Sequence, residues 1–108
     1  MIIQNRDISG KKLNETTSRK VLIAGQELML AEFHFSKGGV GEPHRHESHE
    51  QVGYVVKGSF EILVGNEKRI VKQGDCYHAP KNTLHGVVSL EDDSIIVDAF
   101  TPIRQDFL

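Results

Sequence analysis

The sequence predicts an all-β domain, a β-sandwich or barrel, and three observations lead to that prediction. Apolar and β-branched residues come in short runs, several of which alternate with polar residues in the two-residue period of a strand. Glycine, proline and asparagine separate these runs at a spacing of roughly 8–12 residues, which is typical of sandwiches and barrels. No stretch of about 10–15 residues keeps a 3.6-residue apolar period, which argues against a parallel α/β architecture.

The first expected strands cover residues 21–24 and 28–35. The earlier run is apolar throughout and ends at Gly25. The later run alternates, so its apolar side chains share one face: Met29, Ala31, Phe33 and Phe35. The glycine-rich segment 38–41 then interrupts the pattern, so no strand is expected there.

The next strands are expected over residues 51–56, 59–64 and 68–71. Gly58 closes the first of them. The second places its apolar side chains on one face: Phe60, Ile62 and Val64. A glycine–asparagine pair at residues 65–66 forms the tight turn that leads into the third.

The last expected strands cover residues 76–79, 85–89 and 94–101. A glycine–aspartate pair precedes the first, and a proline-containing turn separates it from the second. The final run is long, β-branched and largely apolar, as a buried strand is. We therefore expect residues 20–108 to form the β-domain, and residues 1–19 to be an N-terminal extension that could contact a second copy of the chain.

Composition excludes several classes of function. A chain of 108 residues with 26% charged side chains has the ordinary size and composition of one globular domain. The net charge of −2 offers no basic surface for nucleic acid, and no apolar run approaches the ~20 residues that cross a bilayer. The N-terminus lacks the layout of a signal peptide, and Cys76 has no second cysteine to pair with. We therefore expect a cytoplasmic protein that binds no nucleic acid or membrane.

The stretch HRHESHEQ, which begins at His44, holds three histidines and is a candidate metal site. If His44 begins a strand, His44 and His46 point to the same face and can bind one ion. Gln51 and Glu50 have opposite parity in the following strand, so only one of them can share that face. We take Gln51 as the expected ligand and Glu50 as the alternative. His85 follows a turn and can add a ligand from a distant part of the chain.

The other histidines are expected to have no ligand role. His49 has the wrong parity for the cluster and is expected to be exposed. His34 and His78 lie within expected strands, and we interpret them as ordinary structural residues. The metal site is therefore expected to use three of the six histidines in the chain.

Two motifs in this region resemble those of the cupin superfamily. The first contains, at the spacing of that superfamily, Gly38, His44, His46, Gln51 and Gly58. The second contains Gly74, Pro80 and His85. Three positions depart from the usual pattern, with Gln51 in place of glutamate, Asn82 in place of glycine and Ser89 in place of asparagine. Asparagine tolerates left-handed backbone better than most residues, so the change at position 82 is mild.

The resemblance implies a double-stranded β-helix, or jelly-roll barrel, in which His44, His46, Gln51 and His85 bind one divalent metal ion. Imidazole nitrogen and amide oxygen suit first-row ions, so Ni, Zn, Fe, Mn and Cu all stay open. The four ligands are neutral and leave the ion its full charge, which favours Lewis-acid chemistry on an anionic substrate. Small cupins commonly pair, so we expect a homodimer by analogy.

An acid stands in the middle of the last apolar run. Asp98 shares a face with Ile96 and Phe100, and if that face lines the barrel, its carboxyl lies in an apolar cavity that can also hold the metal. Such a carboxyl is a candidate for proton transfer. The alternative is an edge-strand aspartate that pairs with Arg104 or with a backbone amide. Arg104 itself can clamp a carboxylate with two hydrogen bonds, or be a solvated tail residue.

The chain resembles the KdgF group of pectin-degradation cupins over roughly residues 19–108. The similarity is carried most specifically by His85-Gly86-Val87-Val88-Ser89-Leu90-Glu91 and Asp98-x-Phe100-x-Pro102-x-Arg104-x-Asp106-Phe107-Leu108. The resemblance implies metal-dependent isomerisation of 4,5-unsaturated uronates from pectin or alginate to linear keto acids. It also implies that Asp98, Phe100 and Arg104 are functional residues.

In the resulting hypothesis, Asp98 moves a proton between the anomeric hydroxyl and C4 of the substrate. Arg104 holds the substrate carboxylate, and Phe100 forms an apolar wall along the sugar. Two other functions stay open at this point. A different metal-dependent cupin enzyme, such as a dioxygenase, would consume oxygen, and a non-catalytic sugar-acid-binding cupin would bind uronates without turnover.

Overall fold

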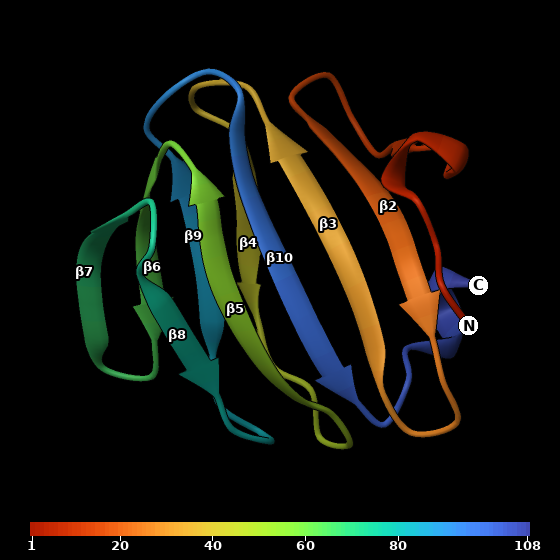
Figure 1. Ribbon diagram of the computed structural model, residues 1–108. Coiled ribbons are helices and arrows are strands. Elements are labelled where there is room, and N and C mark those ends of the chain that lie inside the picture. Colours follow the sequence, from red (N-terminus) through yellow and green to blue (C-terminus); the bar gives the residue numbers. More distant parts are fainter.

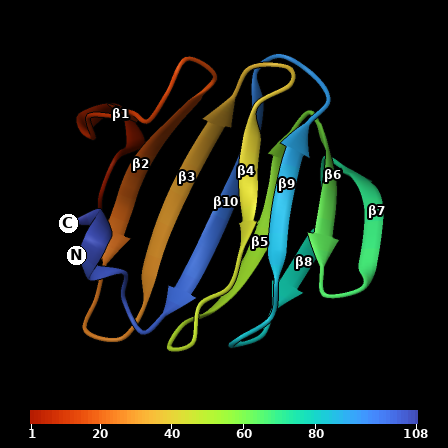
Figure 2. The same cartoon turned by 180° about the vertical axis from the view of Figure 1, so that it is seen from behind.

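The computed structural model describes residues 1–108 and consists of strands in two antiparallel sheets, with two short 3-10 turns (Figure 1). The elements in chain order are η1 (Asn5–Asp7), β1 (Lys11–Lys12), β2 (Thr17–Ala24), β3 (Met29–Phe35), β4 (Val40–His44), β5 (Glu50–Lys57), β6 (Ser59–Val64), β7 (Glu67–Lys72), β8 (Cys76–Ala79), β9 (His85–Ser89), β10 (Ser94–Thr101) and η2 (Gln105–Phe107). One sheet has the order β1-β2-β3-β10-β5-β8, and the other the order β4-β9-β6-β7. The two layers lie one behind the other in both views (Figure 2), which confirms the predicted all-β fold. No helix of the structure is long and apolar enough to span a membrane.

The expected strands are all present, and β6, β8, β9 and β10 have the predicted bounds. β2 is longer than expected, because it begins at Thr17 instead of residue 21. Two strands were not expected. β1 is a two-residue strand in the N-terminal segment, and β4 occupies the segment whose glycines interrupt the apolar pattern. β4 pairs with β9 at Val40, Gly41 and His44, with a shift in register before His44. That irregularity lets the strand accommodate Pro43. His44 is the last residue of β4, whereas the parity argument for His44 and His46 was conditional on His44 beginning a strand.

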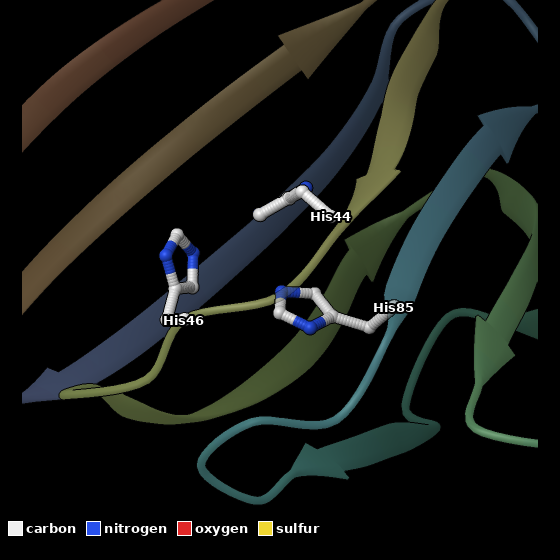
Figure 3. Close-up of side chains that lie close together, drawn as sticks. All are labelled: His44, His46 and His85. Carbon is white, nitrogen blue, oxygen red and sulfur yellow. The ribbon is translucent and has the colours of Figure 1, made fainter.

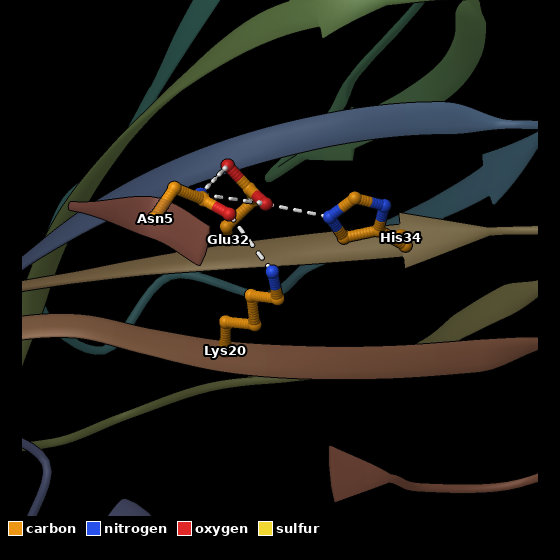
Figure 4. Close-up of polar contacts among 4 residues, drawn as sticks. All are labelled: Asn5, Lys20, Glu32 and His34. Carbon is orange, nitrogen blue, oxygen red and sulfur yellow. Dashed lines mark hydrogen bonds and ion pairs between the residues drawn. The ribbon is translucent and has the colours of Figure 1, made fainter. Parts of the chain in front are cut away.

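The N-terminal segment packs against the outer face of the six-stranded sheet (Figure 4). The side-chain amide of Asn5 donates to Glu32 at 3.2 Å and accepts from Lys20 at 2.8 Å. Glu32 also bonds the ring of His34 at 2.6 Å, so His34 has the structural role that we expected. β2 starts within the segment expected to be an extension, and its residues 17–19 already belong to the sheet.

The two-residue period places the core as the sequence predicts. Alternate residues of β10 are buried, and the inward parity of β5 and β3 agrees with the predicted faces. Between the sheets, one apolar cluster is formed by Phe35, Val55, Phe60, Ile62 and Ile96. A second is formed by Met29, Ala31 and Phe100. Asp98 lies between the two clusters along β10, so a carboxyl interrupts an otherwise apolar interior.

Candidate metal centre and its cavity

Three histidines, His44, His46 and His85, converge on one another (Figure 3). Their ring centroids are 4.4 Å apart for His44 and His85, 4.6 Å for His44 and His46, and 5.4 Å for His46 and His85. One nitrogen atom from each ring lies within 4.8 Å of the others. The register explains the convergence, because His44 and His85 are direct partners on β4 and β9.

Backbone carbonyls orient two of these rings. Nδ1 of His44 lies 2.7 Å from the carbonyl oxygen of Glu42, and Nδ1 of His85 lies 2.9 Å from that of Thr83. A carbonyl only accepts, so in the neutral rings Nδ1 carries the proton and Nε2 keeps its lone pair. Nε2 of His85 is buried and has no hydrogen-bond partner. This is the arrangement in which an imidazole is prepared to bind a metal ion.

Gln51 faces the interior, and Glu50 does not. The Gln51 side chain is buried, its Nε2 donates to the hydroxyl of Tyr77 at 2.7 Å, and its Oε1 is buried without a partner. Glu50 lies on the opposite face of β5, where it bonds Nε2 of His78 at 2.6 Å. The parity argument therefore holds, and of the two alternatives only Gln51 can reach the interior.

The donor set fits a divalent transition ion. Three imidazoles and one amide are the ligand types that first-row metals accept. The two buried polar atoms without partners, Oε1 of Gln51 and Nε2 of His85, would each cost free energy if they stayed unsatisfied. An ion would satisfy both, and the histidine cluster can hold one.

The surroundings of His46 and His85 favour the neutral form of both rings. Burial, with the nearby charge of Arg104 next in size, lowers the pKa of His46 to about 4. Burial also lowers the pKa of His85, against a bond to the Thr83 carbonyl that raises it. Neutral rings are the form that binds metal, so at pH 7 these two need not lose a proton first.

His49 was expected to be exposed, and in this respect the sequence interpretation was wrong. Its side chain is half-buried, with Nε2 3.2 Å from the carbonyl oxygen of Ile103 and its ring 5.6 Å from that of His46. The residue lies before β5 in an irregular segment, where strand parity does not apply. It links this loop to the C-terminal segment.

Asp98 is buried and faces the cavity, as the inward-face hypothesis required. Burial raises the pKa of its carboxyl to about 7, and a hydrogen bond donated by Tyr77 at 2.7 Å opposes that rise. The alternative pairing with Arg104 does not occur, because Arg104 bonds Asp106. A carboxyl with this pKa can both accept and release a proton near neutral pH.

The raised pKa of Asp98 predicts how stability changes with pH in the metal-free protein. Between pH 4 and 7 the folded state holds this proton and the unfolded state does not, so the wild type loses stability as pH rises. Asp98→Asn cannot ionise and escapes this loss. We expect the variant to be the more stable protein at pH 8, with an advantage that shrinks as pH falls to 4. Urea unfolding of both proteins in chelator measures this, and a difference that does not depend on pH would contradict it.

Arg104 approaches the histidines from the C-terminal segment. Its Nε and Nη2 donate to the two carboxylate oxygens of Asp106 at 2.9 and 2.7 Å, and its Nη1 lies 3.1 Å from Nε2 of His46. Arg104 is therefore not a solvated tail residue. We expected its fork to clamp a substrate carboxylate, but Asp106 occupies one edge of that fork and Nη1 donates one proton to Nε2 of His46, so one proton on Nη1 and one on Nη2 are the donors left.

Phe100 lines the cavity but is only 2% exposed. Its ring packs edge-on against Phe107 at 5.6 Å, and the guanidinium carbon of Arg104 lies 5.5 Å from its centre. Phe100 therefore packs behind Arg104 as part of the cavity wall, and it offers little surface to a ligand.

Two residues of the cavity were missed in the sequence. Tyr77 bonds both Gln51 and Asp98, and it shares the inward parity of Ala79 on β8, which was the available signal. Arg19 points inward from β2, with its guanidinium carbon 3.9 Å from the centre of the Phe107 ring. Burial lowers the pKa of Arg19, as does Arg104, against an opposing effect of Asp106. Thr17 and Val21 have the same strand parity as Arg19, and this alternation could have indicated that Arg19 points inward.

The cavity that these side chains surround has a volume of about 260 Å³ and is open to solvent. Its polar lining includes His44, His85, Gln51, Asp98, Arg19 and Arg104. The two arginines converge on one phenylalanine, and of the two nearby acids Asp106 is already bonded to Arg104, while burial raises the pKa of Asp98 to about 7. The charge balance of the cavity therefore favours an anionic ligand.

Comparison with known proteins shows the family of this chain. Residues 31–101 match the family model of the cupin domain. Among curated proteins, the pectin degradation protein KdgF of Dickeya dadantii (strain 3937) is 48% identical over 98 residues, which cover 91% of this chain and 89% of that protein.

Solved structures give the same result. KdgF from Halomonas sp. has a TM-score of 0.97 at 40% identity, with 100% of this chain and 98% of that chain covered. An RmlC-like cupin from Shewanella frigidimarina NCIMB 400 has a TM-score of 0.91 at 31% identity, with 97% and 93% covered. The resemblance predicted from the sequence motifs is confirmed.

Proposed function

Since this chain belongs to the cupin family, and within it to the KdgF group, we propose that it converts 4,5-unsaturated uronates from pectin or alginate into linear keto acids. One observation supports this function above all. A buried carboxyl with a pKa of about 7 lines the same small cavity as His44, His85 and Gln51, three of the expected metal ligands. An acid–base group beside a Lewis-acid site suits a reaction that only moves a proton and opens a ring.

The reaction is an isomerisation in which atoms and electrons balance. The substrate carries a C4–C5 double bond conjugated to its carboxylate, with the ring oxygen on C5. Loss of the anomeric hydroxyl proton lets the C1–O5 bond break, which leaves an aldehyde at C1 and an enolate at C5. Protonation at C4 then gives the ketone at C5, so no oxidant is required.

We assign this proton transfer to Asp98. Its carboxylate accepts the proton of the anomeric hydroxyl, and its protonated form delivers a proton to C4. A pKa of about 7 allows both steps, since neither form is strongly favoured at neutral pH. The hydrogen bond from Tyr77 holds one carboxyl oxygen and leaves the other for the substrate.

His44, His46, Gln51 and His85 would hold the metal ion. When bound, the ion supplies Lewis acidity that stabilises negative charge on a substrate oxygen. Four neutral ligands leave that charge undiminished, and Ni, Zn, Fe, Mn and Cu are all compatible with them.

Arg19 and Arg104 would bind the substrate carboxylate, and their shared contact with Phe107 places both guanidinium groups along one wall. Phe100 supports that wall from behind. Of these two arginines, Arg104 forms an ion pair with Asp106, whereas Arg19 forms no ion pair within the protein.

We therefore expect Arg19→Ala to raise KM by ~10–100-fold with a smaller effect on kcat, the loss that goes with one charge-assisted hydrogen bond. Lys20→Ala is the matched control, because Lys20 lies next in the strand, points outward and bonds Asn5. Steady-state kinetics of the three proteins make the measurement. Equal KM values for wild type and Arg19→Ala would remove this arginine from the substrate site.

The function itself is tested by following the loss of ultraviolet absorbance of the conjugated alkene in unsaturated galacturonate. Metal-loaded protein should accelerate this loss far above buffer, and a chelator-stripped sample should be slow until metal is restored. No acceleration by the loaded protein overturns the proposal. Oxygen consumption during turnover would instead favour a dioxygenase, and uronate binding without turnover a sugar-acid-binding cupin.

Cytoplasmic location and a homodimer stay predictions. The outer face of the six-stranded sheet exposes Val52, Tyr54 and Val56 on β5, an apolar surface that a second copy could cover. Size-exclusion chromatography with light scattering gives the oligomeric state.

A further inference from the structure

We propose that Tyr77 is a positioning residue that fixes the amide of Gln51 in the orientation needed to bind metal, and that Gly53 provides the space for it. The inference concerns the metal ligand Gln51, so it rests on the metal site of the proposed function. Tyr77 acts through the two side chains that it bonds, Gln51 and Asp98, and not by direct contact with the ion or the reacting atoms.

Three neighbouring strands bring the group together. β10, β5 and β8 lie side by side in the six-stranded sheet (Figure 1). Gly53 is the register partner of Asp98 on one side and of Tyr77 on the other. The ring of Tyr77 can therefore cross the middle strand and reach Asp98 only because position 53 carries no side chain. A Cβ at Gly53 would overlap both the Tyr77 ring and the Asp98 carboxylate. This accounts for a glycine inside a strand, where it is otherwise unfavourable.

The hydroxyl of Tyr77 has one proton, and the geometry decides where it goes. It is donated to Oδ1 of Asp98 at 2.7 Å. The hydroxyl must then act as an acceptor toward Gln51, and it receives a bond from Nε2 at 2.7 Å. The amide is thereby turned so that Oε1 points away from Tyr77, and this oxygen is the buried acceptor without a partner. An amide oxygen binds a metal ion, whereas the NH₂ group cannot.

Without the hydroxyl, the amide would lose the bond that distinguishes its two orientations. A phenylalanine keeps the ring in place but offers no acceptor to Nε2. Part of the protein would then present the NH₂ group toward the histidines, and metal binding would have to turn the amide first. Removing such a partner of a metal ligand typically costs ~10–100-fold in affinity.

The chain offers a matched control, because it contains two tyrosines and Tyr54 is the other. Tyr54 lies next to Gly53 on β5 and is 52% exposed on the outer face. Zn²⁺ affinity, measured by competition with a chromophoric chelator, should fall by ~10–100-fold in Tyr77→Phe and stay unchanged in Tyr54→Phe. Wild-type affinity in Tyr77→Phe overturns the proposal.

A double-mutant cycle separates positioning from packing. Glutamate at position 51 has two equivalent oxygens, so it has no orientation to lose. On a Gln51→Glu background, Tyr77→Phe should therefore change Zn²⁺ affinity little. The same loss on both backgrounds would mean that Tyr77 acts through packing alone, and it would overturn the proposal.

Tyrosine spectroscopy adds a readout that does not depend on turnover. The chain has no tryptophan, so Tyr54→Phe leaves Tyr77 as the sole source of tyrosine fluorescence. Zn²⁺ should change that signal, because the ion binds the amide that is bonded to the Tyr77 hydroxyl. An unchanged signal at saturating Zn²⁺ counts against the inference. If these binding results hold but unsaturated uronates are not turned over, the proposed function fails and the positioning role stands.

Discussion

Replacing Asp98 by asparagine is expected to lower kcat for unsaturated galacturonate by ~10²–10⁴-fold, the usual effect of removing a general acid–base group. Asparagine has nearly the same shape and can still accept the hydrogen bond from Tyr77 at its amide oxygen, but it cannot carry a proton to C4. The loss should appear in kcat and in kcat/KM together, because proton transfer stabilises the transition state and not the bound substrate. Stopped assays of alkene absorbance measure both constants.

Two measurements show that such a loss comes from the chemistry. Zn²⁺ affinity of Asp98→Asn should stay close to that of wild type, since Asp98 is not among the proposed ligands. The variant should also be folded, and at pH 8 more stable than the wild type in the metal-free state, because the wild type buries a group whose pKa is about 7. An active Asp98→Asn enzyme would remove this residue from the mechanism and require another proton carrier.

Replacing His85 by alanine is expected to weaken Zn²⁺ binding by more than ~100-fold, beyond the loss seen when only an outer partner of a ligand is removed. His85 is buried, its Nδ1 is bonded to the Thr83 carbonyl and its Nε2 has no protein partner. A bound ion would satisfy this nitrogen, so we assign the ring to metal binding. Activity should fall with metal occupancy. Chelator competition gives the affinity, and metal content after dialysis gives the occupancy.

His78→Ala is the control for that experiment. His78 is also a strand histidine with one close hydrogen bond, but it lies on the outer face and bonds Glu50. Its removal should leave metal affinity and turnover unchanged. Wild-type Zn²⁺ affinity in His85→Ala would show that the ion, if bound, lies elsewhere.

The sequence alone determined the fold class and most of the strands, because these depend on local chemistry. A two-residue apolar period sets which side chains of β3, β5, β6 and β10 face inward, and turn residues mark where the chain reverses. The same period correctly placed Gln51 and Asp98 inside and Glu50 outside. Where the period fails, as in the irregular strand β4 and at His49, the sequence interpretation failed too.

Only the tertiary structure decided which side chains meet. Register between β4 and β9 brings His44 against His85, and register across β10, β5 and β8 brings Tyr77 to Asp98 over Gly53. Two further contacts depend on how the chain ends pack. Arg104 bonds Asp106 in a 3-10 turn, and Arg19 lies over the ring of Phe107. Periodicity determines the face of the strand to which each side chain points. The distance between side chains from segments far apart in the chain depends on strand pairing, and no local sequence pattern specifies that pairing.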